Sequence, residues 1–137
     1  MNETLFFVGQ DPTNGIELWK SDGTPDGTGM VENINPGASS NPKNLTAYNN
    51  FLFFFADDGT NGSEFWISDG TESGTAMVKD INPAGSSLVD AGMWSINGKL
   101  FFPANDGSAG RELWSSDGTQ ANTVLFKDIN PGVNSSG

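Results

Sequence analysis

One loop of the sequence carries the oxygen ligands that a calcium ion prefers. Asp57, Asp58, Asn61 and Glu64 fall within eight residues that also contain two glycines. Hard cations are held by several carboxylate and carbonyl oxygens that converge from such a turn, but the spacing is too short for an EF-hand. A hairpin loop whose Asp and Asn side chains bind their own backbone explains the same residues. We favour the hairpin loop and keep calcium binding as an alternative.

Three glutamates suggest a second chemistry, acid catalysis on a glycosidic bond. Glu17, Glu64 and Glu112 each stand two residues before a tryptophan. Glycosidases place two carboxyl groups about 5–10 Å apart on one substrate. An active site normally breaks the symmetry of a repeat, whereas these three positions are equivalent. We therefore expect them at a sheet edge or in a hydrogen-bond network, and a glycoside hydrolase is a remote alternative.

Three Asp-Gly-Thr segments recur without substitution. An Asp side chain caps backbone N–H groups of a turn, and the glycine after it takes a positive φ. Catalysis would not need three copies, so we assign these segments to structural turns. The turn residues are Asp22, Gly23, Thr24, Asp69, Gly70, Thr71, Asp117, Gly118 and Thr119.

The tryptophans are candidates for stacking on sugar rings. Trp19, Trp66 and Trp114 recur at one position beside Leu or Phe, which is more typical of a core aromatic. Trp94 stands where the first copy has Thr46, so the repeat does not require it, and it is a candidate ligand contact. A lectin-like or calcium-dependent carbohydrate binder therefore remains a second candidate function.

The elements that must position these residues form a tandem repeat. The segment 17–24 returns at 64–71 and 112–119, with tryptophans 47 and 48 residues apart. The extra residue of the second interval lies between Ser87 and Met93, in a connection, where insertions are best tolerated. We treat residues 1–137 as one repeat domain. Its repeats cover residues 5–51, 52–99 and 100–137.

Each repeat is predicted to contain four strands and no helix, arranged as an antiparallel meander. In the second repeat the strands are expected at 51–56, 64–68, 76–81 and 93–96. The first of them is apolar on both faces, so other sheets should cover it on both sides. An all-β propeller, or a fragment of one, meets that demand, because each of its four-stranded blades lies between two others.

The third repeat ends before the counterpart of the strand at 93–96, so we expect eleven strands, with the last strand of the third blade missing. Propellers usually close with about four to eight blades, and three blades leave faces and edges uncovered. We therefore expect self-association. A dimer that closes a six-bladed ring is the leading arrangement. The alternatives are an open filament and an excised or engineered piece of a longer array.

The repeated Glu-Leu-Trp-x-Ser-Asp-Gly-Thr motif, followed by Gly-Thr in the first two copies, resembles the ELWxxDGT repeat family of bacterial extracellular and cell-surface proteins. The match covers nearly the whole chain. Phe65 replaces the motif leucine in the second copy, and Asn122 replaces the later glycine in the third. The resemblance implies a β-propeller at the cell surface or outside the cell. Our leading hypothesis is a non-catalytic structural or binding module that displays its loops for adhesion or assembly.

The amino-acid composition limits the kinds of partner and site that this chain can have. A net charge of −11 disfavours nucleic acids and anionic membrane surfaces. The chain has no Cys and no His, which excludes disulfides, thiolate metal sites and the commonest general base. Its longest apolar run, 51–56, is too short to cross a bilayer, so no membrane insertion is expected. The first residues lack the features of a signal peptide, and no cofactor is expected apart from possible calcium.

Overall fold

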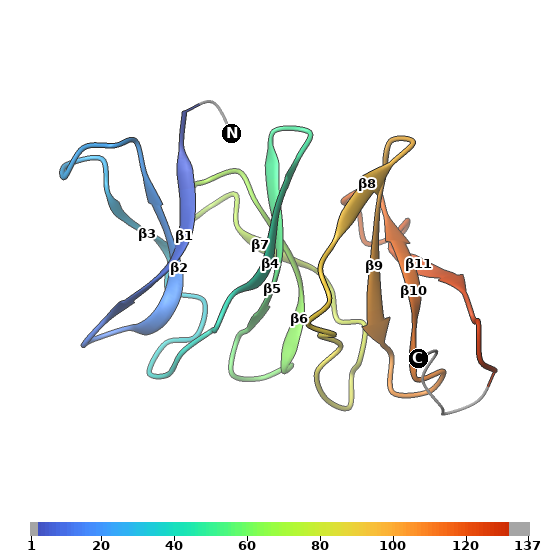
Figure 1. The fold of residues 1–137 in the computed structure, drawn as a ribbon. Helices are drawn as coiled ribbons and strands as arrows, with labels where there is room; N and C mark the ends of the chain where they lie inside the picture. Colours follow the sequence, from blue (N-terminus) through green and yellow to red (C-terminus); the bar gives the residue numbers. More distant parts are fainter. Residues whose placement is uncertain (1–2, 132–137) are drawn as a thin grey trace.

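The computed structural model describes residues 3–131 and is all-β, with eleven strands in three antiparallel sheets that stand side by side (Figure 1). No residue of this range is helical. The first sheet contains β1 (Leu5–Asp11), β2 (Gly15–Ser21) and β3 (Gly29–Glu32). The second contains β4 (Lys43–Tyr48), β5 (Phe51–Asp57), β6 (Ser63–Ser68) and β7 (Ala76–Lys79). The third contains β8 (Trp94–Ile96), β9 (Lys99–Asn105), β10 (Arg111–Ser116) and β11 (Val124–Lys127).

In every sheet, strands that follow one another in sequence are hydrogen-bonded neighbours, which confirms the predicted meander. The sheets are nevertheless out of phase with the sequence repeats. Strand β4 ends the first repeat but pairs with β5 of the second, and β8 pairs with β9 in the same way. Residues 132–137, which belong to the third repeat, lie outside the described residues.

The three-stranded sheet is therefore the first one, and the prediction that the third blade lacks a strand was wrong. Two tight turns are the reason. Asn49 and Asn50 join β4 to β5 with φ values of 50° and 64°, and Asn97 and Gly98 join β8 to β9 with 51° and 74°. Two successive residues with positive φ suit the two-residue hairpin whose twist matches that of paired strands.

Two predicted strands are shorter than expected. Strand β7 ends at Lys79 rather than at residue 81, and β8 begins at Trp94 rather than at residue 93. The pairing of β6 with β7 already shifts register between Phe65 and Trp66. Beyond that bulge the backbone N–H of Ile81 donates to a side chain of β6 instead of continuing the ladder.

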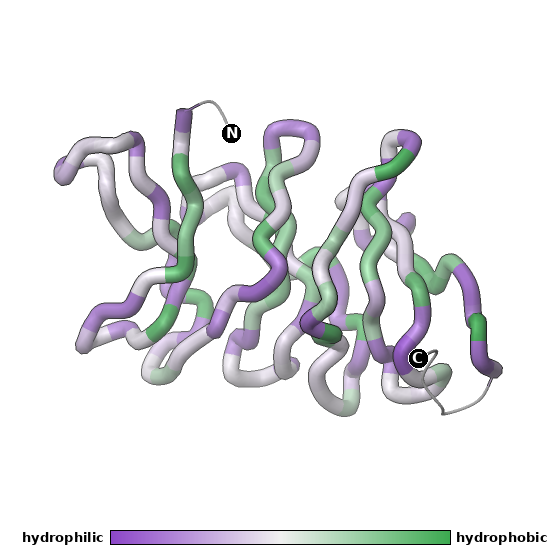
Figure 2. Tube along the Cα trace, in the orientation of Figure 1, coloured by the Kyte–Doolittle hydropathy of each residue, from purple (hydrophilic) through white to green (hydrophobic). Residues whose placement is uncertain are grey.

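The sheets pack face to face through two apolar clusters. The sheets are stacked in sequence order. We call the side of a sheet that points from the first sheet toward the third its forward face, and the opposite side its back face. Figure 2 shows hydrophobic residues along the strands and hydrophilic ones at many of the turns. The first cluster joins Leu18, Val31 and Ile34 of the first sheet to Leu52, Phe54, Ala56 and Trp66 of the second. The second joins Phe53, Phe55, Phe65, Val78 and Ile81 to Leu100, Phe102, Ala104 and Trp114 of the third.

Strand β5 is buried on both faces, as its apolar run predicted. Phe54 points to the first sheet, Phe53 and Phe55 point to the third, and none of the three is more than 2% exposed. Burying one such side chain contributes about 1.5–3 kcal/mol. The stack of sheets is thus stabilised mainly by aromatic burial on the two sides of its middle member.

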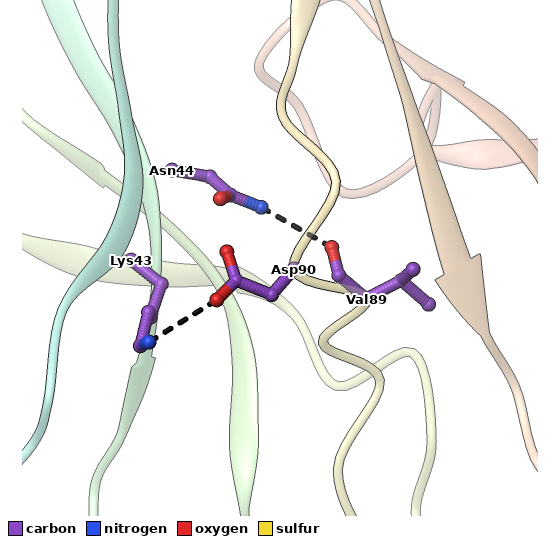
Figure 3. A network of polar contacts seen from close by, with 4 residues as sticks. All are labelled: Lys43, Asn44, Val89 and Asp90. Atoms are coloured by element: carbon purple, nitrogen blue, oxygen red, sulfur yellow. Dashed lines mark hydrogen bonds and ion pairs between the residues drawn. The ribbon is translucent and has the colours of Figure 1, made fainter.

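Polar contacts add a link between the second and third sheets (Figure 3). Lys43 at the start of β4 forms an ion pair of 3.1 Å with Asp90, and Asn44 donates to the carbonyl oxygen of Val89 at 3.2 Å. The Lys43 and Asp90 side chains are about half exposed, and ion pairs in that position contribute at most about 1 kcal/mol. These contacts orient the connection that leads to β8, while the apolar clusters supply most of the stability.

Candidate functional site

The repeated Asp-Gly-Thr segments form three equivalent turns, each after the second strand of its repeat. In the second repeat, Asp69 Oδ1 accepts hydrogen bonds from Thr71 N at 2.8 Å and Thr71 Oγ1 at 2.6 Å. The first and third turns repeat both bonds. The threonine hydroxyl is the largest of the causes that lower the pKa of the aspartate in each turn. The three carboxyl groups are thus used to close turns.

The glycines of these turns have φ values of 93°, 91° and 96° for Gly23, Gly70 and Gly118, a region that an L side chain enters at a cost of about 1–2 kcal/mol. We expect Gly23→Ala to lower the free energy of unfolding by about that amount, because a Cβ there meets nothing within 4 Å. At Gly118 the Cβ lies 3.1 Å from the ring of buried Phe53.

Gly118→Ala should therefore cost about 1 kcal/mol more than Gly23→Ala, measured by urea unfolding of both variants. The two substitutions share the turn type and differ only in what the new methyl group meets. Equal losses would show that the third turn does not pack on the second sheet as described.

The four calcium candidates are not brought together. Asp58 Oδ1 accepts from the backbone of Thr60 and Asn61, and Asp58 Oδ2 accepts from Asn61 Nδ2 at 2.7 Å. Burial acts to raise the pKa of Asp58, but these hydrogen bonds lower it below its ordinary value. Asp57 caps Gly59 N, and Glu64 binds a different loop. Among residues 3–131 no three acidic side chains group as metal ligands. Asp57 and Asp58 bind the backbone of their own segment, as expected for a hairpin loop.

The three repeated glutamates are buried inside their own repeats. Glu64 Oε1 accepts from Ser87 N at 3.0 Å, while Oε2 accepts from Ile81 N at 2.7 Å and from Ser87 Oγ at 2.6 Å. Burial raises the pKa of Glu64, and the bonds from Ser87, Ile81 and Asn82 offset part of that rise. The carboxylate therefore holds the loop after β7 against the sheet and does not face solvent, where a glycoside would bind.

Equivalent bonds recur in the other two repeats. Glu17 accepts from Ile34 N, Ser40 N and Ser40 Oγ, and Glu112 accepts from Ile129 N. Because each glutamate binds a loop of its own repeat, the structure does not pair any two of them on one surface. Sequence reasoning predicted the network but could not name its donors.

The repeated tryptophans lie on the back faces of the three sheets. Trp66 and Trp114 are 8% and 6% exposed and belong to the apolar clusters. Trp19 is less buried, because no sheet covers the back of the first sheet in the described residues. Trp94 lies on β8, pairs with Phe101 and is 55% exposed, so it is available for contact.

Within residues 3–131, no sheet covers the two apolar faces at the ends of the stack, and each face has buried counterparts in the same residues. On the forward face of the third sheet, Phe126 and Ile129 are 56% and 58% exposed, whereas their equivalents Val78 and Ile81 are in the core. The Phe101 and Phe126 rings meet edge to face with centroids 5.0 Å apart. On the back face of the first sheet, Leu5 is 63% exposed, and Phe7, Gly9 and Trp19 stand where the other sheets bury Phe, Ala and Trp. The two faces are therefore equivalent to the two sides that meet at each boundary between sheets within the chain.

Comparison with family models, curated proteins and solved structures finds no match for this chain. The resemblance to the ELWxxDGT repeats thus rests on the motif residues, and the functional argument rests on the geometry described above.

Proposed function

We propose that this chain is a non-catalytic β-propeller repeat module that assembles with further copies of the same unit, as a scaffold or adhesion element at the cell surface. The observation that carries the proposal is the match between its two uncovered faces. Repeat arrays that stand alone end in units with a polar outer face. Here both outer faces are apolar. Inside the stack, each equivalent face is covered by a neighbouring sheet of the same chain.

The contact inferred from this match runs from head to tail. The forward face of the third sheet, with Phe126 and Ile129, would receive the back face of another copy's first sheet, with Leu5 and Phe7. Such a contact joins two different surfaces, so it closes into a ring if the rotation between copies allows it and otherwise grows into a filament. Two copies supply six sheets, which is within the usual range of propellers.

The edge of the first sheet supports the same proposal. In the second and third sheets, β5 and β9 are paired on both sides, whereas β1 pairs only with β2 in the described part of the chain. An unpaired strand edge is a template for a further strand. A strand from an adjoining repeat would complete this sheet to four strands.

Solution mass tests the proposal. We expect the wild-type chain at micromolar concentration to have a native mass above 14.5 kDa. Moderate salt should favour the assembly, because copies with a charge of −11 repel one another. Phe126→Glu and Leu5→Glu should each yield single copies, because each places a charge on one of the two faces.

Mixing the two variants is the sharper test. Each keeps the face that the other has lost, so the mixture should form a one-to-one pair that grows no further. A face-to-face contact between identical surfaces would instead leave one variant fully able to dimerise alone. A wild-type chain that stays at 14.5 kDa, or a mixture that does not pair, would contradict the head-to-tail contact.

Other functions find less support in the described residues. The buried glutamates disfavour a glycoside hydrolase, and a charge of −11 disfavours nucleic acid. Among residues 3–131 no helix is long and apolar enough to cross a membrane.

A further inference from the structure

A groove of about 460 Å³ lies between the first and second sheets, at the end of the molecule where the Asp-Gly-Thr turns are. Its volume falls within the usual range of small-molecule sites. The residues used in the following argument are Thr4, Phe6, Lys20, Asp22, Asn50 and Asp69. The groove lies within one copy, between its own sheets, and does not depend on assembly.

Two of these residues are polar where the second copy of the repeat is apolar. Lys20 stands where the second repeat has Ile67, and Thr4 stands where it has Phe51. Ile67 lies against the next turn, since a Cβ on Gly118 would be 3.8 Å from its Cδ1. At the first boundary, Lys20 Nζ instead donates to the carbonyl oxygen of Gly70 at 2.6 Å. The third repeat has Ser115 and Lys99 at these positions, so polar residues are not unique to the first repeat. The polar pair does distinguish the boundary between the first and second sheets from the boundary between the second and third, where apolar residues occupy the same positions.

The two aspartates each present one carboxylate oxygen that the turn does not use. In both, Oδ1 accepts the threonine bonds. The third turn shows what the other oxygen can do, because Asp117 Oδ2 accepts from Asn122 Nδ2 at 2.6 Å. The first two turns have Gly27 and Gly74 at the position of Asn122. Oδ2 of Asp22 and Asp69 can therefore accept a donor from a ligand.

The groove contains hydrogen-bond donors, acceptors and groups that do both. Lys20 has three N–H donors, one of which is used by Gly70, while the carboxylates only accept. The Asn50 amide and the Thr4 hydroxyl both donate and accept, and Phe6 adds an aromatic ring. A ligand that suits this set needs several donors and acceptors and one apolar face. Anions are disfavoured by two carboxylates and a charge of −11, and cations are disfavoured by Lys20.

We propose that this groove binds a neutral carbohydrate, whose hydroxyl groups bind Asp22, Asp69 and Lys20 while a face of the sugar ring rests on Phe6. The hydroxyl groups donate to the two Oδ2 atoms and accept from the ammonium. This is a second activity of the module, beside its assembly through the outer faces.

The test measures binding of glucose, galactose, mannose, N-acetylglucosamine, cellobiose and maltose by saturation-transfer NMR, and locates the site by amide shifts of the labelled protein. We expect at least one of these sugars to bind at millimolar concentration and to shift the amides of Lys20 and Asp69. Inorganic phosphate and spermidine serve as charged probes and should not bind there.

Comparison of equivalent positions in the three repeats gives the test variants and their control. The double variant Thr4→Phe, Lys20→Ile copies the second repeat into the groove and should weaken sugar binding by about tenfold or more. Asp69→Asn removes one charged acceptor from the groove and should weaken binding by about tenfold. Asp117→Asn makes the same change in a turn that does not line the groove, and should leave sugar affinity unchanged.

The inference would be overturned by no binding of any of the six sugars, by binding that survives the double variant, or by amide shifts that map away from the groove. Binding of phosphate or spermidine in place of sugar would do the same. Because native mass is measured separately, loss of the carbohydrate site and loss of head-to-tail assembly are distinguishable outcomes.

Discussion

Replacing Glu64 by glutamine is expected to lower the free energy of unfolding by about 2–3 kcal/mol, although the side chain keeps its size. Both carboxylate oxygens of Glu64 accept from buried donors, Oε1 from Ser87 N and Oε2 from Ile81 N. Glutamine has one oxygen and one NH₂ group, so in either orientation one of these N–H groups faces another donor. A buried donor left unpaired costs about 1–3 kcal/mol.

Glu72→Gln is the control, because Glu72 is exposed and such surface changes usually stay within about 0.5 kcal/mol. Chemical denaturation of both variants gives the comparison. A loss at Glu64 no larger than that at Glu72 would show that the carboxylate does not hold the loop after β7.

The difference in free energy of unfolding between the wild type and Glu64→Gln should also depend on pH. Burial raises the pKa of Glu64, so the folded state binds a proton more readily than the unfolded state does. The wild type therefore gains stability from this group as the pH falls through the folded-state pKa, and the gain is complete below the ordinary pKa. Glu64→Gln lacks this gain, so the difference in stability between the two proteins should widen as the pH falls.

Strand positions and turns were predictable because they depend on local chemistry. The run at 51–55 has no polar residue on either face, so burial on both sides followed from composition alone. The Asp-Gly-Thr turns likewise need only the capping ability of Asp and the positive φ of Gly. The structure agrees with both expectations at Phe54 and Asp69.

Which strands belong to the same sheet could not be predicted from the repeat, because a four-stranded meander can begin at any of the four strands of a periodic sequence. The local signal lay in Asn49-Asn50 and Asn97-Gly98, whose positive φ values join the last strand of one repeat to the first of the next. The donors to Glu64 were hidden for another reason. They lie 17 and 23 residues away, and only the folded loop brings them to the carboxylate.

The groove was also missed, although the sequence contained its signal. Lys20 and Thr4 depart from the second repeat just as Trp94 departs from the first. The tryptophan is conspicuous as an unmatched aromatic residue, whereas polar residues such as Lys20 and Thr4 are common on protein surfaces. Their significance became visible only when the structure placed them beside Asp22 and Asp69.

Phe102→Ala is expected to lower the free energy of unfolding by about 3–5 kcal/mol, which is typical of removing a fully buried aromatic side chain. Phe102 is 0% exposed, and its ring centroid lies 4.6 Å from that of Phe65 and 5.6 Å from that of Phe55. Alanine would leave a cavity between the second and third sheets, and the rigid rings around it cannot close in.

Phe7→Ala is the matched control, because Phe7 holds the same repeat position on the back face of the first sheet, which no sheet covers within residues 3–131. In dilute protein its loss should be clearly smaller than that of Phe102→Ala, measured by thermal and urea unfolding. At concentrations that favour assembly, Phe7→Ala should instead reduce native mass, because the ring then lies in the proposed contact. Equal losses in dilute protein would contradict the inference that this face is open in the single copy and is buried only by a partner.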